Sequence, residues 1–263
     1  MVTLNVAAVP SINCDEVERK IIRFLKREAG HRGVVLGLSG GIDSATVAAL
    51  SVEALGKQKV LALIMPEDGS TPREDSDDAI SYAEELGISY RIVNITNATR
   101  CVISSVASGE NRVAEGNIKA RIRMLTLYYF ANSECRIVVG SGDRSELLIG
   151  YFTKYGDGGA DVLPIGGLYK TQVRQLAKSI GIPSRIISKK SSPCLWDGQT
   201  AEGELGIDYD QLDIILHMLV DRKMKREEIA DQLGEGGDAL VDKIKERIDN
   251  NAHKLRTPPI PKI

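Results

Sequence analysis

The chain has 263 residues, of which 43% are hydrophobic and 27% charged, and its formal net charge is −2. A chain of this length can bury a large core without disulfides or a structural metal. The balanced charge argues against a broad nucleic-acid-binding surface, and the apolar runs are far shorter than the ~20 residues of a membrane-spanning helix.

In the first half, short apolar runs alternate with helical patterns. A helix is predicted from near Asn13, where Glu16 lies three residues on as in a capping box. Buried strands are predicted at residues 34–38, 60–65, 88–93 and 136–140, and helices between them at residues 44–55, 72–86 and 116–130. Because the strands lack in–out alternation, both faces of their sheet should be covered. The pattern predicts an α/β fold with a doubly wound parallel sheet flanked by helices, and ligands at the carboxyl ends of its strands.

The second half changes character. Residues 150–206 are rich in Gly, Asp, Lys and Ser, with one clear helix predicted at residues 170–180. A long stretch of this kind that contains aromatic residues is typical of functional loops. Helices are again predicted at residues 209–221, 226–233 and 238–250, followed by an extended proline-containing tail. The C-terminal part is therefore expected to be helical.

The cysteines and the N-terminus bear on localisation. Cys14, Cys101, Cys135 and Cys194 are scattered, and their spacing predicts neither a zinc site nor a redox dithiol. Cys135 follows an apolar helix pattern and is predicted to be a small core residue. Residues 1–10 lack the basic segment of a signal peptide, so we expect a cytoplasmic protein.

The strongest motif, residues 38–44, reads LSGGIDS and joins the first strand to a helix. Small residues let the backbone approach an anion closely, and amides at a helix N-terminus then bind it. The alternative is a structural turn in which Asp43 or Ser44 caps the helix. The loop has no lysine before its final serine, unlike a Walker A loop. Asp43 stands there instead, and a carboxylate beside polyphosphate implies a bridging Mg²⁺.

Amides without the lysine, together with an acidic metal ligand, suggest that pyrophosphate is the leaving group. The loop resembles that of the N-type ATP pyrophosphatases, which adenylate a carboxyl or carbonyl oxygen and then release AMP. Residues 140–161, which read GSGDRSELLIGYFTKYGDGGAD, are similar to the signature of the ammonia-dependent NAD synthetase family. Further similar blocks lie at residues 117–123, 164–171, 195–200 and 253–254.

This resemblance covers nearly the whole chain. It implies one synthetase domain over residues 1–263 with an adenine nucleotide alpha hydrolase-like fold, and it leaves no room for a glutaminase domain. The implied substrates are ATP, deamido-NAD and free ammonia, without nucleic acid or membrane. Deamido-NAD would attack the α-phosphorus of ATP to give an adenylate and pyrophosphate, and ammonia would then displace AMP.

The resemblance also implies roles for individual residues. It assigns ATP contacts to Gly37, Leu38, Ser39, Gly40, Gly41, Ile42, Asp43, Ser44, Ser141, Lys170 and Ser192. It assigns deamido-NAD contacts to Arg121, Lys154, Asp161, His253 and Lys254. Mg²⁺ would be held by Asp43 and Glu146, and catalytic roles fall to Asp43, Lys170 and Asp157. Asp157 is expected to hold ammonium and to accept its proton.

The assignments have structural alternatives. Glu146 could satisfy a helix dipole, the lysines and Arg121 could be solvated charges, and the aspartates of the glycine-rich loop could belong to turns. The pair His253 and Lys254 could cap a helix, and Trp196 is expected to anchor packing.

Three positions depart from the family pattern. Ser141 replaces a threonine, Asp143 replaces a frequent asparagine, and the segment around Ser192 differs. Asp143 adds a negative charge close to the expected phosphates.

Two rival functions and two structural expectations remain. A tRNA thiolase would need extra cysteines or an RNA-binding domain, and a nucleotide-binding sensor would not need Glu146, Lys170 and Asp157 together. The resemblance implies a homodimer, and the apolar helix at residues 124–130 fits either its interface or a central helix of the monomer. Residues 150–159 and 189–206 are expected to act as lids.

Overall fold

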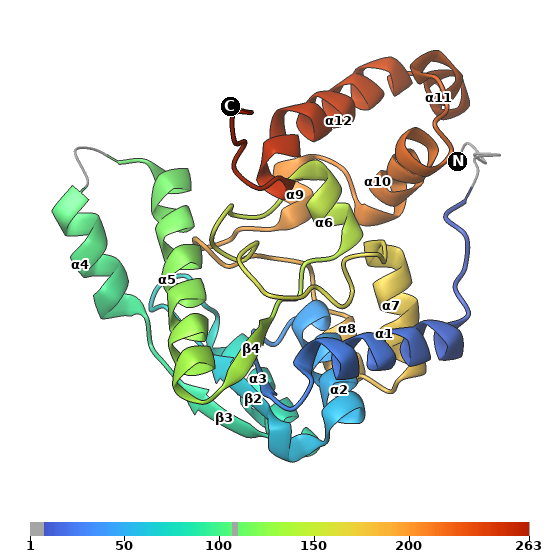
Figure 1. The fold of residues 1–263 in the computed structure, drawn as a ribbon. Coiled ribbons are helices and arrows are strands. Elements are labelled where there is room, and N and C mark those ends of the chain that lie inside the picture. The colour runs from blue at the N-terminus through green and yellow to red at the C-terminus, as the bar shows by residue number, and fades with distance from the viewer. Residues whose placement is uncertain (1–7, 107–109, 263) are drawn as a thin grey trace.

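A four-stranded parallel sheet organises the fold. The computed structural model describes residues 8–106 and 110–262. The sequence analysis expected no signal peptide in residues 1–10, and residues 1–7 of that segment lie outside the described residues. The strands are β1 (Gly33–Gly37), β2 (Val60–Ile64), β3 (Ser89–Ile92) and β4 (Arg136–Val139). Their order is β3-β2-β1-β4, and every pairing is parallel. The chain thus winds outward from β1 to β3 and returns to the other side of β1, which confirms the doubly wound sheet (Figure 1).

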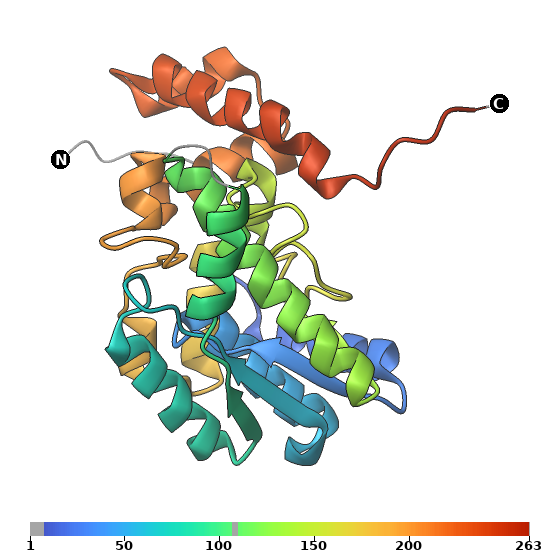
Figure 2. The ribbon, with the colours of Figure 1, turned by 90° about the vertical axis from the view of Figure 1, so that its left-hand side faces the viewer.

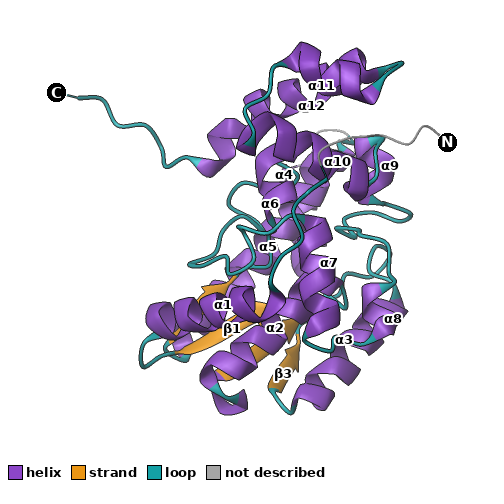
Figure 3. Cartoon of the chain, turned by 90° about the vertical axis from the view of Figure 1, so that its right-hand side faces the viewer, coloured by secondary structure: helices purple, strands orange, loops and turns teal. Residues whose placement is uncertain are grey.

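Helices cover both faces of β1, β2 and β4, as the absence of alternation predicted, whereas the edge strand β3 was predicted to be buried and is mostly exposed. One layer contains α1 (Cys14–Ala29), α2 (Ile42–Leu55), α3 (Arg73–Leu86), α7 (Lys170–Ser179) and α8 (Ser184–Ile187). The other layer contains α5 (Arg112–Ser133), which lies on the opposite side of the sheet from α1 and α2 in Figure 1. Figure 3 views the molecule from the side of the first layer. Successive residues of β1 point to opposite layers. Val34 and Leu36 pack in the first core, and Val35 packs with Val138 in the second.

The C-terminal part forms a separate helical cluster above the carboxyl edge of the sheet (Figures 1 and 2). It consists of α9 (Ala201–Leu205), α10 (Tyr209–Leu216), a π-helical turn (His217–Asp221), α11 (Arg226–Leu233), α12 (Gly237–Asn251) and a 3₁₀ turn (Ala252–Leu255). It packs on α6 (Arg144–Ile149) through Ile149. The predicted helical C-terminal part is confirmed, and the tail after residue 255 extends away from it (Figure 2).

Several local predictions need correction. The side chain of Asn13 accepts a hydrogen bond from the Glu16 amide at 3.1 Å, as predicted. The residue that caps α2 is Gly41, however, and neither Asp43 nor Ser44 does so, because the helix begins at residue 42. Cys135 was predicted to be buried, and this is wrong: it is exposed in the turn between α5 and β4 with φ +51°.

Four helices escaped the sequence analysis: α4 (Thr96–Val106), α6, α8 and α9. Three of them have only four to six residues, and α4 is rich in threonine, serine and β-branched residues, which favour other conformations. Within the described residues, no helix combines the length and the apolar character that crossing a bilayer requires.

Candidate functional site

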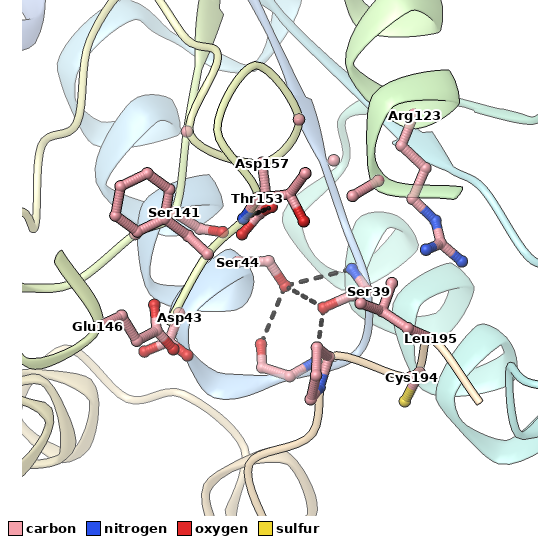
Figure 4. Close-up of a pocket in the computed structure, with 18 of the residues that line it drawn as sticks. Ser39, Asp43, Ser44, Arg123, Ser141, Glu146, Thr153, Asp157, Cys194 and Leu195 are labelled. Carbon is pink, nitrogen blue, oxygen red and sulfur yellow. Dashed lines mark hydrogen bonds between the residues drawn. The ribbon is translucent and has the colours of Figure 1, made fainter. Parts of the chain in front are cut away.

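A cleft of about 630 Å³ opens at the carboxyl ends of β1, β2 and β4. It lies at the position where the strand order reverses, between β1 and β4, where doubly wound sheets bind their ligands. Its walls come from the loop after β1, the end of β2, one face of α5 and the segments 150–160 and 189–199 (Figure 4). Both segments predicted as lids therefore border the cleft.

The loop between β1 and α2 is held by its two serines. The Ser44 hydroxyl donates to the Gly41 carbonyl at 3.0 Å and lies 3.1 Å from the Ser39 hydroxyl. The Ser39 oxygen in turn accepts from the Gly41 amide at 3.3 Å (Figure 4). These bonds fix the loop against the start of α2, and the first backbone amides of a helix have no partners within the helix and can bind an anion. Seven of the predicted ATP contacts in and around this loop line the cleft: Gly37, Leu38, Ser39, Gly41, Ile42, Asp43 and Ser44.

Gly40 contributes to the loop differently. Its φ is +79°, and a Cβ atom there would lie 2.3 Å from the Asp75 carbonyl oxygen. Only glycine tolerates both the left-handed conformation and the approach of α3. Gly40 therefore shapes the loop from behind rather than facing the cleft.

Three carboxylates converge beside this loop. Asp43 lies in the first turn of α2, Asp143 is the N-cap of α6, and Glu146 lies in the first turn of α6. Each offers an oxygen within 4.8 Å of the others. The ammonium of Lys170, the first residue of α7, lies 2.7 Å from Asp43, 2.8 Å from Asp143 and 3.0 Å from Glu146. The structure thus brings the predicted Mg²⁺ ligands Asp43 and Glu146 together and adds Asp143, and it buries Lys170, predicted to contact ATP, among these carboxylates and outside the cleft lining.

Burial dominates the ionisation of this cluster. Removal from water, with Asp143 nearby, raises the pKa of Glu146 to about 8, although Lys170 opposes the shift. Burial likewise raises the pKa of Asp143 to about 6. Burial alone would lower the pKa of Lys170, but the three carboxylates outweigh it and raise that pKa well above its ordinary value. Glu146 therefore holds a proton at neutral pH in the absence of a cation, and the cluster becomes more negative when that proton leaves.

The donor set suits a hard divalent cation. Its donors are carboxylate oxygens, which Mg²⁺ and Mn²⁺ prefer. Asp43 Oδ1 is buried, and among the described residues it has no hydrogen-bond partner. An unsatisfied buried carboxylate oxygen is costly unless a cation or a donor reaches it. Asp43 and Glu146 line the cleft, so an ion held between them would meet the ligand there.

The other predicted catalytic and ATP-contacting residues lie around the same cleft. The Asp157 carboxylate points into it and accepts the Thr153 amide at 2.8 Å (Figure 4). Desolvation by the surrounding loop raises its pKa, while the Thr153 hydrogen bond and Lys254 oppose the rise. Ser141 and Ser192 also line the cleft. The Ser192 hydroxyl donates to the Gln199 carbonyl at 2.7 Å, which folds residues 192–199 over the cleft.

The predicted deamido-NAD contacts form a second group. Arg121 donates to the Lys154 carbonyl at 3.3 Å, and the Lys154 ammonium donates to the His253 carbonyl at 3.0 Å. Lys254 donates to the carbonyls of residues 150 and 152 and reaches the cleft. The pair 253–254 thus ties the C-terminus to the loop after α6. Asp161 lies apart from this network, with its carboxylate accepting the Val138 amide at 2.7 Å.

Some residues of the cleft were not predicted. Arg123 lies on the face of α5 that borders the cleft and donates to the Met65 carbonyl at 3.1 Å, whereas Arg121, two residues earlier, is exposed. Residues two apart on a helix point in different directions, so the helix period could have separated the two arginines. Trp196 packs under the Arg112 guanidinium at 4.8 Å, as the predicted anchor, and also lines the cleft.

The loop geometry predicts that Gly40→Ala destabilises the protein and weakens ATP binding. The added Cβ atom meets the backbone of α3 in a conformation that alanine disfavours, so we expect the free energy of unfolding to fall by about 1–3 kcal/mol. Urea unfolding and calorimetric ATP titration would measure the two effects. Gly167→Ala, which meets no atom within 4 Å, serves as the control. Equal behaviour of the two variants would contradict the prediction.

The raised pKa values predict an unusual pH dependence in the presence of EDTA. The folded protein holds a proton on Glu146 up to about pH 8, whereas the unfolded chain releases it near the ordinary value of 4.5. The folded state therefore binds more protons between these values, and the free energy of unfolding should fall as pH rises, by about 1–3 kcal/mol. Urea unfolding from pH 5 to 8 measures this, and Glu146→Gln should flatten the curve. Identical curves for both proteins would refute the assignment.

Comparison with known proteins agrees with this geometry. A family model described as NAD synthase matches residues 16–258. The NH(3)-dependent NAD(+) synthetase of Archaeoglobus fulgidus is 47% identical over 255 residues, covering 96% of this chain and 98% of that protein. Two solved structures match 96% of this chain and 100% of their own: NMN synthetase from Francisella tularensis (33% identity, TM-score 0.84) and NH3-dependent NAD synthetase from Campylobacter jejuni (32% identity, TM-score 0.80). The chain therefore belongs to the NAD synthase family of carbon–nitrogen ligases, and it forms NAD from deamido-NAD with ammonia and ATP.

Proposed function

We propose that the cleft at the switch point binds ATP and deamido-NAD together, and that Asp43 and Glu146 hold Mg²⁺ there. The observation that carries this proposal is the placement of two carboxylates beside the loop at the start of α2, both facing one cleft. The loop amides neutralise phosphate charge, and carboxylates next to them suit a cation that phosphates share. When bound, Mg²⁺ would supply charge neutralisation at the phosphates.

In the first step, a carboxylate oxygen of deamido-NAD attacks the α-phosphorus of ATP, and the bond to the β-phosphate breaks. The leaving pyrophosphate remains in contact with the amides of residues 39–44 and with the Ser39 and Ser44 hydroxyls. Ser141 and Ser192, which line the cleft, are the further ATP contacts we propose. Lys170 lies behind Asp43 and Glu146, so its contribution is a fixed positive charge close to the phosphates.

In the second step, ammonia attacks the activated carbonyl carbon and AMP leaves. Asp157 points into the cleft and has a raised pKa, which suits a group that binds ammonium and accepts its proton. Arg121, Lys154, Asp161, His253 and Lys254 are proposed to bind deamido-NAD. In the described arrangement the side chains of Arg121, Lys154, Asp161 and Lys254 are hydrogen-bonded to backbone groups, and His253 contributes its carbonyl. We also propose a single catalytic domain without a glutaminase, acting in the cytoplasm.

A homodimer is part of the proposal. Leu125 and Tyr129 lie one turn apart on α5 and are 66% and 67% exposed, which is unusual for large apolar side chains on a helix that also packs on the sheet. We propose that this stripe meets the same stripe of a second copy in an isologous interface. One face of α5, between residues 113 and 127, borders the cleft, so the interface would lie close to the substrate.

The assignment of activity and metal is tested by turnover of deamido-NAD with ATP, Mg²⁺ and ammonium. We expect NAD and pyrophosphate in equal amounts, and a loss of about 10²-fold or more in kcat/KM for Asp43→Asn, because a carboxylate that would hold Mg²⁺ at the phosphates loses its charge. Asp208→Asn, an exposed N-cap far from the cleft, is the matched control.

Three outcomes would contradict parts of the proposal. Glutamine replacing ammonium at a comparable rate would argue against free ammonia as the donor. Turnover without a divalent cation would refute the metal site. A higher kcat/KM for nicotinate mononucleotide than for deamido-NAD would shift the preferred substrate toward that of the Francisella tularensis relative, whose name is NMN synthetase.

The dimer is tested by Tyr129→Asp, which places a charge in the proposed apolar interface. We expect light scattering to change from a dimer to a monomer at micromolar concentration, because burying an unpaired carboxylate is costly. Val102→Asp, on the exposed part of α4, should leave the mass unchanged. A monomeric unmodified protein would disprove the interface.

A further inference from the structure

The three carboxylates of the cluster differ in what they face. The side chains of Asp43 and Glu146 are 20% and 21% exposed, whereas Asp143 is 0% exposed. Asp43 and Glu146 belong to the described residues that line the cleft, whereas Asp143 and Lys170 do not. A ligand that enters the cleft therefore reaches the first two carboxylates, and Asp143 lies behind them.

Asp143 is held in this rear position by its own helix. Its Oδ1 accepts the Glu146 amide at 2.8 Å, and its amide donates to Glu146 Oε2 at 3.3 Å, so it forms the capping box of α6. Turning this carboxylate toward the cleft would uncap the helix. Its other oxygen, Oδ2, is buried and lies 2.8 Å from the Lys170 ammonium, an ion pair without hydrogen-bond geometry.

Lys170 is held just as firmly. Its backbone amide donates to the Ser145 hydroxyl at 3.0 Å, and that hydroxyl donates to the Asp213 carboxylate. The next amide, of Thr171, donates to Asp213 at 2.8 Å. The start of α7 is therefore fixed, and the Lys170 ammonium, 0% exposed, must stay close to the cluster. In this position it pairs with Asp43 Oδ2 and Glu146 Oε1, on the same two carboxylates that would bind the cation.

A divalent cation and an ammonium that share the same two carboxylates repel each other. The described arrangement, with one ammonium against three carboxylates, leaves a net charge of about −2 when all are ionised. Asp143 can keep the ammonium paired while Asp43 and Glu146 turn to the cation. Without the negative charge of Asp143, Lys170 would have only the cation's own ligands as ion-pair partners.

We propose that Asp143 is a positioning residue that retains Lys170, so that Asp43 and Glu146 are free to bind the divalent cation. It acts through Lys170 and does not ligate the metal. This inference rests on the metal site of the proposed function, and it adds a role for a residue that the sequence motifs did not assign.

The test is direct binding of Mn²⁺, measured by electron paramagnetic resonance of the free ion, without nucleotide. Asp143→Asn keeps the helix cap but removes the charge, and should weaken Mn²⁺ binding about tenfold or more. Adding Lys170→Met to this variant removes the competing ammonium and should restore the Kd to within about twofold of the unmodified protein. Asp208→Asn, also an aspartate N-cap, is the matched control and should change nothing.

The outcomes separate this inference from the metal site itself. No Mn²⁺ binding by the unmodified protein would overturn both. Binding that is unchanged in Asp143→Asn would overturn the positioning role alone. If Mn²⁺ binding is weakened in Asp143→Asn and adding Lys170→Met does not restore it, Asp143 is a direct ligand of the cation. This result would also overturn the positioning role. Should the double variant not fold, as checked by thermal unfolding, Lys170→Gln replaces Lys170→Met in the same comparison.

Steady-state kinetics provide a second readout. If Asp143 acts on cation binding, Asp143→Asn should raise the KM for Mg²⁺ about tenfold, while kcat recovers at saturating Mg²⁺. A lower kcat at every Mg²⁺ concentration, with unchanged KM, would contradict the proposed role.

Discussion

The buried ammonium of Lys170 is the contact on which the site depends. It joins the loop after β1, the start of α6 and the start of α7, which lie far apart in the sequence. Burying a charge is tolerable only where opposite charges and hydrogen bonds surround it, and the loss of one partner leaves the others unbalanced. The stability of the carboxyl edge of the sheet and that of the carboxylate cluster are therefore coupled.

The sheet topology explains why these segments meet. Parallel strands place every following loop at one edge, and the reversal of strand order between β1 and β4 opens a space between neighbouring loops. The loop after β1 carries Asp43, and the loop after β4 leads into α6 with Asp143 and Glu146. The cleft is thus a consequence of the winding order, and its acidic wall follows from two helix N-termini that point into it.

The C-terminal helices complete the cleft by holding its loops. Lys254 donates to backbone carbonyls of residues 150 and 152, and Lys154 donates to the carbonyl of His253. These bonds connect segments about 100 residues apart and fasten the glycine-rich loop that carries Asp157. Positioned loops of this kind can exclude water from a reactive adenylate, which would otherwise hydrolyse.

The sequence alone determined the parallel sheet, the phosphate loop and the family. Unbroken apolar strands, small residues before a helix and ordered motifs are local properties, and their physical meaning does not depend on distant contacts. Only the tertiary structure decided the charge relations: that Asp143 joins the cluster and that Lys170 is buried behind Asp43 and Glu146. Burial and electrostatic interaction depend on distances between segments remote in the chain, and no local pattern specifies them.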